Sequence, residues 1–236
     1  MAPREPSIGD YAAIGDCRTL ALVSRFGGID WCCVPDFSSP SVFGALLDRA
    51  LRLHEIQSLP IDVEHLRREC EAIRADIEAR AWDESLGSYA GFYGSQAPDA
   101  SLLLIPRMGY LDPRDPRMLA TTARIRQELS AGGLLYRFPP GRQYDGVEGG
   151  EHLFAICSFW LVDCLARQGS LDEAQALYER LLSLRTPAGL YAEELDSRTG
   201  AAVGNFPQAF SHVGSITAAL SLQSARDAAG LRSTTA

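Results

Sequence analysis

The chain has 236 residues, of which 46% are hydrophobic and 22% charged, as in an ordinary soluble globular protein of one or two domains. Its net charge of -8 excludes nucleic acid and anionic membranes as expected partners, because both select a basic surface. Without an apolar run of about 20 residues or the charged and then apolar pattern of a secretion signal, the sequence predicts a cytoplasmic protein with no membrane partner.

The first 40 residues have the pattern of β-strands. Two short apolar stretches, 20–23 and 29–34, are joined by Phe26, Gly27 and Gly28, and the two glycines supply the positive φ of a hairpin turn. We therefore expect residues 1–40 to form a short β-rich head that ends in a loop.

From Ser41 onward, apolar residues recur at spacings of three and four, which is typical of helices. The pattern predicts about seven helices that begin near residues 41, 62, 99, 115, 150, 170 and 211. We expect them to form one helical domain over residues 41–230, in antiparallel pairs, followed by a frayed tail at 231–236. Bundles and closed toroids both satisfy this pattern, and periodicity does not choose between them.

Several of these helices have recognisable ends. Asp115 followed by proline predicts a capped helix start, and the sequence Ser-Leu-Asp-Glu from Ser170 predicts a capping box. The helix expected over 150–168 is apolar on more than one side, so it should be packed on several faces. Cys157 and Cys164 lie within it and are expected to be reduced core thiols.

Three loops combine acids or amides with aromatic residues and glycines at helix boundaries, namely 144–151, 189–196 and 204–212. Sugar-binding sites need this combination, because aromatic rings stack on the pyranose and polar side chains bind its hydroxyls. Paired carboxylates can then perform acid–base chemistry on a glycosidic bond. The sequence thus indicates a carbohydrate site at these loops.

Two sets of motifs resemble glycoside hydrolase family 15. Those in the helical part resemble the C-terminal half of bacterial glucoamylase- and trehalase-like members: DASLLLIP at 99–106, DPR at 115–117, GLLYR at 133–137, SFWL at 158–161, GLYAEE at 189–194 and GNFPQAFSH at 204–212. Those in the head resemble the extreme N-terminus of the same family: IGDCR at 14–18, GIDW at 28–31 and SPSVF at 39–43. The resemblance therefore covers both ends of the chain.

The resemblance implies a mainly α protein, a partial (α/α)6 toroid or half barrel with a short N-terminal β-hairpin head. In the family, several hundred residues separate the two matching parts and hold most of a β-sandwich, half of the barrel and the general acid. Here the two parts join near residues 48–53, within one continuous helical pattern. An internal deletion, a natural miniature and a mispredicted gene all remain open as explanations.

The resemblance also assigns site residues. Glu193 falls on the family's general base, and a one-residue slip of the alignment would place Glu194 there. The family inverts configuration, so a carboxylate activates water while an acid protonates the leaving oxygen. The chain has no match to the acid motif. The expected substrate-binding side chains surround the base in the three loops: Glu148, Glu151, Tyr191, Asn205, Gln208 and His212.

The sequence predicts neither a metal nor a cofactor, because the four histidines lack ligand-like spacing. The first functional hypothesis is a hydrolase of α-glucosidic bonds, of the glucoamylase or trehalase type, which is weak or inactive in this short form. The alternative is a non-catalytic helical module that binds a saccharide or a protein. Half of a toroid exposes apolar helix faces, so we also expect self-association through them.

Overall fold

The structure is a computed structural model that describes residues 11–15, 20–24, 29–33, 43–141 and 152–230, with side chains from residue 50 onward. It divides into two compact units. The first comprises Met1–Ala81 with Phe92–Gly94, and the second comprises Trp82–Gly91 with Ser95–Ala236. The boundary that the sequence places at residue 40 stays a prediction.

The first unit contains a three-stranded antiparallel sheet with strand order β1-β2-β3. Its strands are β1 (Tyr11–Gly15), β2 (Leu20–Ser24) and β3 (Ile29–Cys33). The expected hairpin between β2 and β3 is confirmed, with Leu20 opposite Cys33. β1 was not expected from the sequence. It pairs with β2 over its whole length, from Tyr11 opposite Ser24 to Gly15 opposite Leu20.

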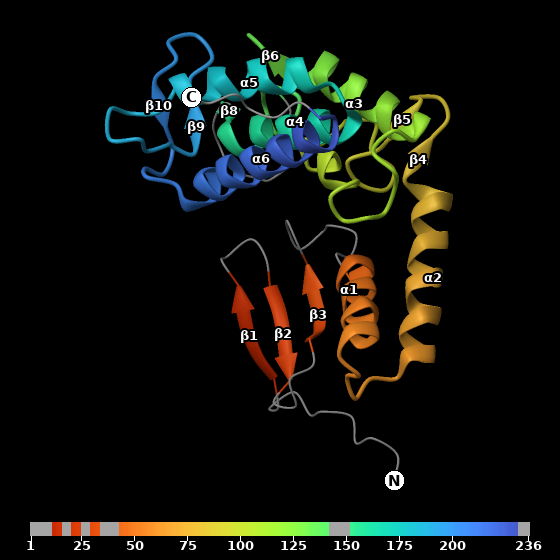
Figure 1. Ribbon diagram of the computed structural model, residues 1–236. Helices are drawn as coiled ribbons and strands as arrows, with labels where there is room; N and C mark the ends of the chain where they lie inside the picture. Colours follow the sequence, from red (N-terminus) through yellow and green to blue (C-terminus); the bar gives the residue numbers. More distant parts are fainter. Residues whose placement is uncertain (1–10, 16–19, 25–28, 34–42, 142–151, 231–236) are drawn as a thin grey trace. The chain divides into compact units, whose positions relative to one another are not determined.

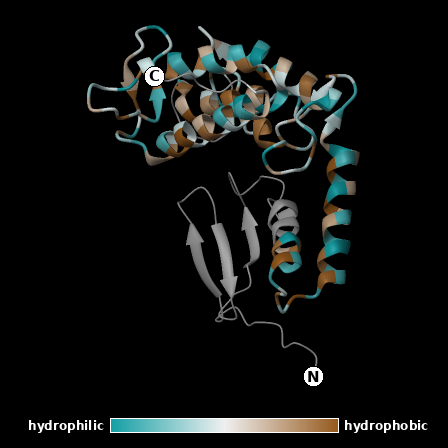
Figure 2. Cartoon of the chain, in the orientation of Figure 1, coloured by the Kyte–Doolittle hydropathy of each residue, from teal (hydrophilic) through white to brown (hydrophobic). Residues whose placement is uncertain are grey.

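Two helices belong to the same unit, α1 (Phe43–Ile56) and α2 (Val63–Arg80). The Asp62 carboxylate accepts a hydrogen bond from the His65 amide at 3.0 Å and so caps α2. None of the residues of α2 is buried, and Figure 2 shows that this helix is largely hydrophilic. Its last turn contacts Tyr93, over whose ring the Arg80 guanidinium lies at 4.0 Å. Burial, with a hydrogen bond to Asp76, raises the pKa of Tyr93 to about 12.

The second unit holds the remaining helices and several very short strands (Figure 1). Its helices are the 3-10 helix η2 (Ala100–Leu104), α3 (Pro116–Leu129), α4 (Ala155–Gln168), α5 (Leu171–Ser183) and α6 (Ala209–Ala228). Its two-residue strands are β4 (Trp82–Asp83), β5 (Ser88–Tyr89), β6 (Ser130–Ala131), β7 (Leu134–Leu135), β8 (Leu153–Phe154), β9 (Glu194–Leu195) and β10 (Ala202–Val203). The mainly helical character that the sequence predicts is confirmed.

Helix α4 is the centre of this unit, and α5, α6 and η2 pack around it. Of its 14 residues 11 are buried, which confirms that the helix is packed on several faces. Cys157 and Cys164 are reduced core residues with no exposed surface, as expected, and burial raises the pKa of Cys164 to about 11. The helix begins five residues later than predicted, because Leu153 and Phe154 form a strand before it. Within the described ranges, no helix is long and apolar enough to span a membrane.

The predicted helix starts agree with the structure in part. The Asp115 carboxylate accepts from the Arg117 amide at 2.8 Å and Pro116 occupies the first turn of α3, as expected. Ser170 does precede α5, but its hydroxyl makes no capping hydrogen bond, so the capping box is wrong in that respect. The acidic side chains of Asp172 and Glu173 still lie in the first turn of α5, where their negative charges interact favourably with the positive end of the helix dipole.

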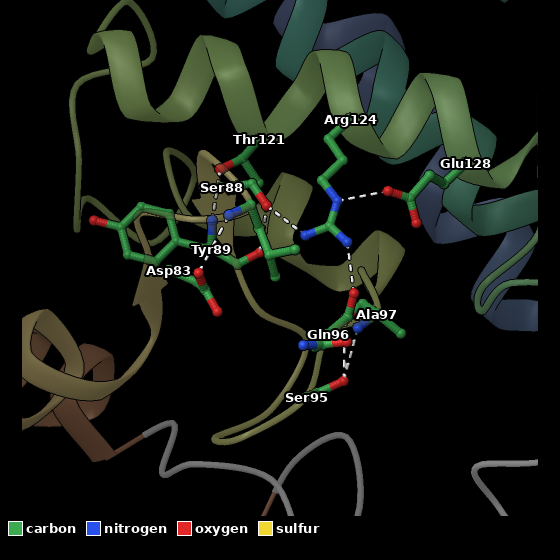
Figure 3. A network of polar contacts seen from close by, with 10 residues as sticks. Asp83, Ser88, Tyr89, Ser95, Gln96, Ala97, Thr121, Arg124 and Glu128 are labelled. Atoms are coloured by element: carbon green, nitrogen blue, oxygen red, sulfur yellow. Dashed lines mark hydrogen bonds and ion pairs between the residues drawn. The ribbon is translucent and has the colours of Figure 1, made fainter.

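Arg124 connects α3 to the segment that follows β5 (Figure 3). Its guanidinium donates to the Ser88 hydroxyl at 2.8 Å, the Gln96 carbonyl at 2.6 Å and the Glu128 carboxylate at 2.6 Å. The planar fork thus satisfies three acceptors from separate parts of the chain. Beside it, the Thr121 hydroxyl accepts from the Tyr89 amide at 3.1 Å. Together these bonds fix Ser88, Tyr89 and Gln96 against α3.

A second polar network lies at the C-terminal end of α4, around Asp163, which is 2% exposed. Its carboxylate accepts from Arg107 at 3.1 Å and from Arg167 at 2.9 Å. The Ser221 hydroxyl of α6 donates a further hydrogen bond to it. A buried carboxylate needs such partners, because desolvation otherwise penalises its charge. The network joins α4, α6 and the segment after η2.

We predict that Asp163→Ala lowers the free energy of unfolding by about 2–3 kcal/mol, since removing one member of a buried charge cluster leaves the others unpaired. The expected loss in free energy is modest for a buried charge cluster, because Arg107 and Arg167 are each 35% exposed and water can solvate their charges when Asp163 is removed. Urea denaturation measures it. Asp227→Ala is the control, because Asp227 is exposed on α6 and should change stability by less than about 0.5 kcal/mol. Equal losses for the two variants would contradict this account of Asp163.

Candidate active site

Glu193 lies at the end of a small antiparallel ladder with strand order β10-β9-β8. Glu194 pairs with Phe154 on one side and with Val203 on the other. Next to this pair, the Glu193 carbonyl accepts from the amide of Ala155, the first residue of α4, at 3.0 Å. The Glu193 amide donates to the Asn205 carbonyl at 2.9 Å. Both backbone groups of Glu193 are therefore fixed.

Asn205, whose carbonyl accepts from the Glu193 amide, also binds the Glu193 carboxylate. Oε2 accepts from the Asn205 amide at 3.0 Å and from Asn205 Nδ2 at 2.8 Å. These two hydrogen bonds to Oε2 orient the side chain. Both oxygens of a carboxylate accept hydrogen bonds, so Oε1 can accept from another donor. One carboxylate oxygen is therefore anchored, and the other can accept from a further donor such as a water molecule.

Gly204 makes the close approach of Asn205 to Glu193 possible. Its φ of +74° is a conformation that residues with a Cβ rarely adopt. A Cβ at this position would also lie 2.9 Å from Glu193 Oε2 and 3.1 Å from Glu193 Cβ. The glycine therefore satisfies a backbone requirement and a steric requirement of the same carboxylate.

The first turn of α6 positions the residues before Glu193. His212 Nδ1 lies 2.7 Å from the Gln208 carbonyl, and His212 Nε2 accepts from the Tyr191 amide at 3.3 Å. Since a carbonyl only accepts, this pattern assigns the ring proton to Nδ1. The Gln208 amide donates to the Tyr191 carbonyl at 3.0 Å, and the Ser211 hydroxyl donates to the Ala192 carbonyl at 2.9 Å. Gln208 and His212, both expected to bind substrate, are thus brought together here by bonds to the backbone.

Tyr191 lies in the core and is 5% exposed. Its ring packs edge-on against Phe159 of α4 at 5.3 Å and against His212 at 5.4 Å. Burial raises the pKa of its phenol. This placement gives Tyr191 the role of a support for the loop that carries Glu193. The substrate contact expected from the sequence stays a prediction.

Of the other residues expected at the site, Glu194 and Asn205 are described by the structure and two glutamates are not. Glu194 is half-buried in β9, one position from Glu193, and its neighbours in the ladder fix its backbone. Asn205 is exposed and bound to Glu193, as described above. Glu148 and Glu151 lie outside the described residues. Among the residues that the structure describes, no group of three His, Cys, Asp or Glu side chains could hold a metal ion.

Arg137 is a polar candidate that the sequence did not single out. Its side chain is 13% exposed, and one Nη lies 3.7 Å from the Asp99 carboxylate, beyond hydrogen-bonding distance. Within the described residues, Nε and that Nη are buried without hydrogen-bond partners. Buried donors of this kind are rare in folded proteins and suit a polar ligand. The only sequence signal was its place at the end of the GLLYR motif, two residues after β7.

In the described part of this unit, Glu193 lines neither of two hollows, a small cavity and an open groove. One is a cavity of about 20 Å³ beneath the loop, lined by Ala155, Tyr191, Ala192 and other apolar residues. The other is an open groove of about 520 Å³ along α6, lined by residues such as Arg107, Arg167 and Leu220. Among the described residues, Glu193 therefore lies at a half-exposed edge, next to its partner Asn205.

Comparison with known protein families identifies the class. The family model of the glycosyl hydrolases family 15 matches residues 35–220, which is most of the chain. The chain belongs to this family. The resemblance noted in the sequence motifs is thereby confirmed.

The curated relatives that it matches are trehalases. The chain is 43% identical to the trehalase of Mycolicibacterium smegmatis over 181 residues, which cover 77% of this chain and 27% of that protein. The trehalase of Mycobacterium tuberculosis is 42% identical over 77% of this chain and 26% of its own length. That of Thermoplasma acidophilum is 34% identical, with 77% and 31% covered. The chain thus spans between a quarter and a third of the length of these relatives.

Solved glycosidase structures share the fold. A wild-type glycosidase superposes with a TM-score of 0.63 at 22% identity, over 76% of this chain and 50% of that one. A variant glycosidase in complex with glucose gives 0.64 at 20% identity, over 76% and 49%. The chain spans about half of each structure. The predicted partial helical toroid is confirmed by this likeness.

We predict different effects for alanine at two glycines with the same backbone conformation. Gly200 has a φ of +71° and nothing within 4 Å of an added Cβ, so Gly200→Ala should lower the free energy of unfolding by about 1 kcal/mol, through backbone strain alone. Gly204→Ala adds the clash with Glu193 and should lower it by about 2–3 kcal/mol. Guanidinium denaturation of both variants measures the difference. Equal losses would mean that the Glu193 carboxylate is not held at Gly204.

Proposed function

We propose that this chain carries the water-activating part of a trehalase-type glycoside hydrolase site, with Glu193 as the general base. The anchoring of its carboxylate by Asn205 is the observation that carries the proposal. The matched relatives are named trehalases, which supports trehalose as the first candidate substrate. Maltose is the alternative, from the glucoamylase-like resemblance of the sequence motifs. The predicted cytoplasmic location is kept as part of the proposal.

The proposed chemistry follows from the two oxygens of Glu193. Oε2 is held by Asn205, and Oε1 accepts a proton from a water molecule on the far face of the sugar ring. As that water attacks the anomeric carbon, the bond to the leaving oxygen breaks and the configuration at carbon inverts. A second carboxyl group, about 6.5–9.5 Å away, protonates the leaving oxygen in an inverting enzyme.

The neighbouring residues take supporting and binding roles in this proposal. Asn205 orients the base, and Tyr191 and His212 hold its loop through the first turn of α6. We assign sugar contacts to Gln208 and to the buried donors of Arg137. Glu148 and Glu151 keep the substrate-binding role that the sequence assigns to them.

We further propose that turnover of natural disaccharides by this chain is weak or absent. No residue of the sequence matches the family's general acid, and an alkoxide leaving group departs slowly when it is not protonated. The base can nevertheless work on a substrate whose leaving group needs no proton. Activity on such a substrate therefore distinguishes a site that lacks its general acid from a module that only binds a saccharide.

We predict that the chain hydrolyses α-glucosyl fluoride faster than trehalose or maltose. Fluoride leaves as an anion without protonation, so the reaction needs only the base and its water. Glu193→Gln keeps the shape of the side chain and its bonds to Asn205 but cannot take up a proton. It should lower the rate of fluoride release by about a hundredfold or more, as expected for the loss of a general base. A fluoride electrode follows the reaction.

Glu194→Gln is the matched control, because it removes the adjacent carboxylate from the same ladder and should leave most of the activity. The opposite result, with loss only in Glu194→Gln, would transfer the role of the base to Glu194. Fluoride release at the same rate from the chain and from Glu193→Gln would refute the catalytic proposal. If calorimetry then showed that trehalose binds without turnover, the non-catalytic saccharide-binding module would be the better description.

A further inference from the structure

Asp99 forms an ion pair with Arg137, whose buried donors belong to the candidate site. Its Oδ1 accepts from the Ser101 amide at 2.7 Å and so caps η2. Its Oδ2 lies 3.7 Å from Arg137 Nη2, which is beyond hydrogen-bonding distance. The side chains of Asp99 and Arg137 are 9% and 13% exposed, so the pair lies at the edge of the core. The two charges therefore balance one another without a hydrogen bond between these atoms.

The two donors of Arg137 that have no partner lie on one edge of its guanidinium. Nε and Nη2 are neighbours in this planar group, and their N–H bonds form a fork that can bind two oxygens at once. Within the described residues, both nitrogens are buried without a hydrogen-bond partner. The ring of Phe138 lies 4.9 Å from Cζ and covers one face of the group. The charge and one face are thus compensated, and the edge is left for a ligand.

Backbone contacts and close packing hold this pair in place. The Ala100 amide donates to the Arg137 carbonyl at 3.0 Å, which ties the start of η2 to the segment after β7. Gly91 packs against Asp99, and an added Cβ there would lie 3.0 Å from Asp99 Cβ and 3.1 Å from the Asp99 amide nitrogen. A residue without a Cβ is needed for this close approach. Both partners are therefore positioned by the fold as well as by their charges.

Arg137 and Glu193 are attached to the same end of α4. Arg137 follows β7 by two residues, and the Leu135 amide of β7 donates to the hydroxyl of Ser158 at 3.0 Å. The Glu193 carbonyl accepts from the amide of Ala155, the first residue of that helix. Ala155 and Ser158 are one turn apart, roughly 5 Å along the helix axis. The charged pair therefore belongs to the same part of the unit as the proposed base.

We propose that Asp99 is a positioning residue for saccharide binding, which holds the Arg137 guanidinium so that its free edge binds two neighbouring hydroxyl oxygens of a pyranose ring. The inference rests on the proposed function, because that function supplies the saccharide. Paired hydroxyls present two acceptors to the fork and carry no charge. A neutral ligand fits this arginine, because Asp99 already balances its charge. An arginine without such a partner would select a carboxylate or a phosphate instead.

The negative charge of Asp99 can be removed without removing the helix cap. Asparagine is as good a capping residue as aspartate and can accept from the Ser101 amide through its own oxygen. In Asp99→Asn the guanidinium keeps its backbone anchor but loses the charge that balances it, and an unbalanced buried cation moves toward water or toward an anion. The free edge is then no longer held for hydroxyls. Weaker saccharide binding in a folded chain is the expected consequence.

Calorimetry of trehalose binding to the full chain, together with the kinetics of α-glucosyl fluoride hydrolysis, tests this role. Asp99→Asn should raise both the Kd of trehalose and the KM of the fluoride by about tenfold, and should change kcat by less than about twofold, as expected when a binding contact is lost. Arg137→Lys keeps the charge but not the fork, and should raise Kd at least as much. In that background Asp99→Asn should add less than about twofold.

Competition by inorganic phosphate gives a readout that a purely structural role would not change. In the natural chain, phosphate should displace trehalose no better than chloride at the same ionic strength. In Asp99→Asn the unbalanced guanidinium should bind phosphate at least about tenfold more tightly than it does in the natural chain. Strong competition by phosphate in the natural chain would show an anion site instead of a hydroxyl site and would overturn the proposal.

Asp115→Asn is the matched control. Asp115 also caps a helix, at the start of α3, and forms an ion pair with an arginine, Arg117, at 3.5 Å. Its substitution should change Kd and KM by less than about twofold. Unchanged values in Asp99→Asn, equal losses in the two asparagine variants, or a natural chain that binds no trehalose would each contradict the proposal. A wrong assignment of the base is a separate result, since Glu193→Gln would then keep its rate while Asp99→Asn still weakened binding.

Discussion

The paired hydrogen bonds between Glu193 and Asn205 are the constraint on which the candidate site depends. The Glu193 amide donates to the Asn205 carbonyl at 2.9 Å, and Asn205 returns two bonds to the carboxylate at 3.0 and 2.8 Å. They close the segment from 193 to 205 on itself. The close approach requires glycine at 204, because any Cβ there would collide with the carboxylate.

The packing around α4 makes this small closed segment rigid. The first amide of α4 donates to the Glu193 carbonyl, and the first turn of α6 holds Tyr191 and Ala192. The positive ends of two helix dipoles are thus directed toward the backbone of the loop that carries the acid. At the far end of α4, Asp163 ties the same two helices together. The site and the polar network are therefore opposite ends of one packed helix pair.

The sequence predicted the long helices and the loop at 189–196 that carries Glu193, because both have strong local signals. Apolar spacing indicated α3 and α4, and the Asp115–Pro116 start was correct because its bonds are local. The β8-β9-β10 ladder could not be predicted, since two-residue strands are too short to show a period and depend on residues about 40 apart. Periodicity also could not tell which apolar side of α6 is buried. Arg137 needed the structure, because burial, and not residue type, distinguishes it.

The most direct test of the account is a double-mutant cycle between Glu193 and Asn205, measured on the rate of α-glucosyl fluoride hydrolysis. If Asn205 acts by anchoring the base, Asn205→Ala should lower the rate by about 10- to 100-fold in the natural chain and by less than about twofold when Glu193 is already glutamine. Equal losses in both backgrounds would contradict the account, because Asn205 would then act independently of the carboxylate that it holds.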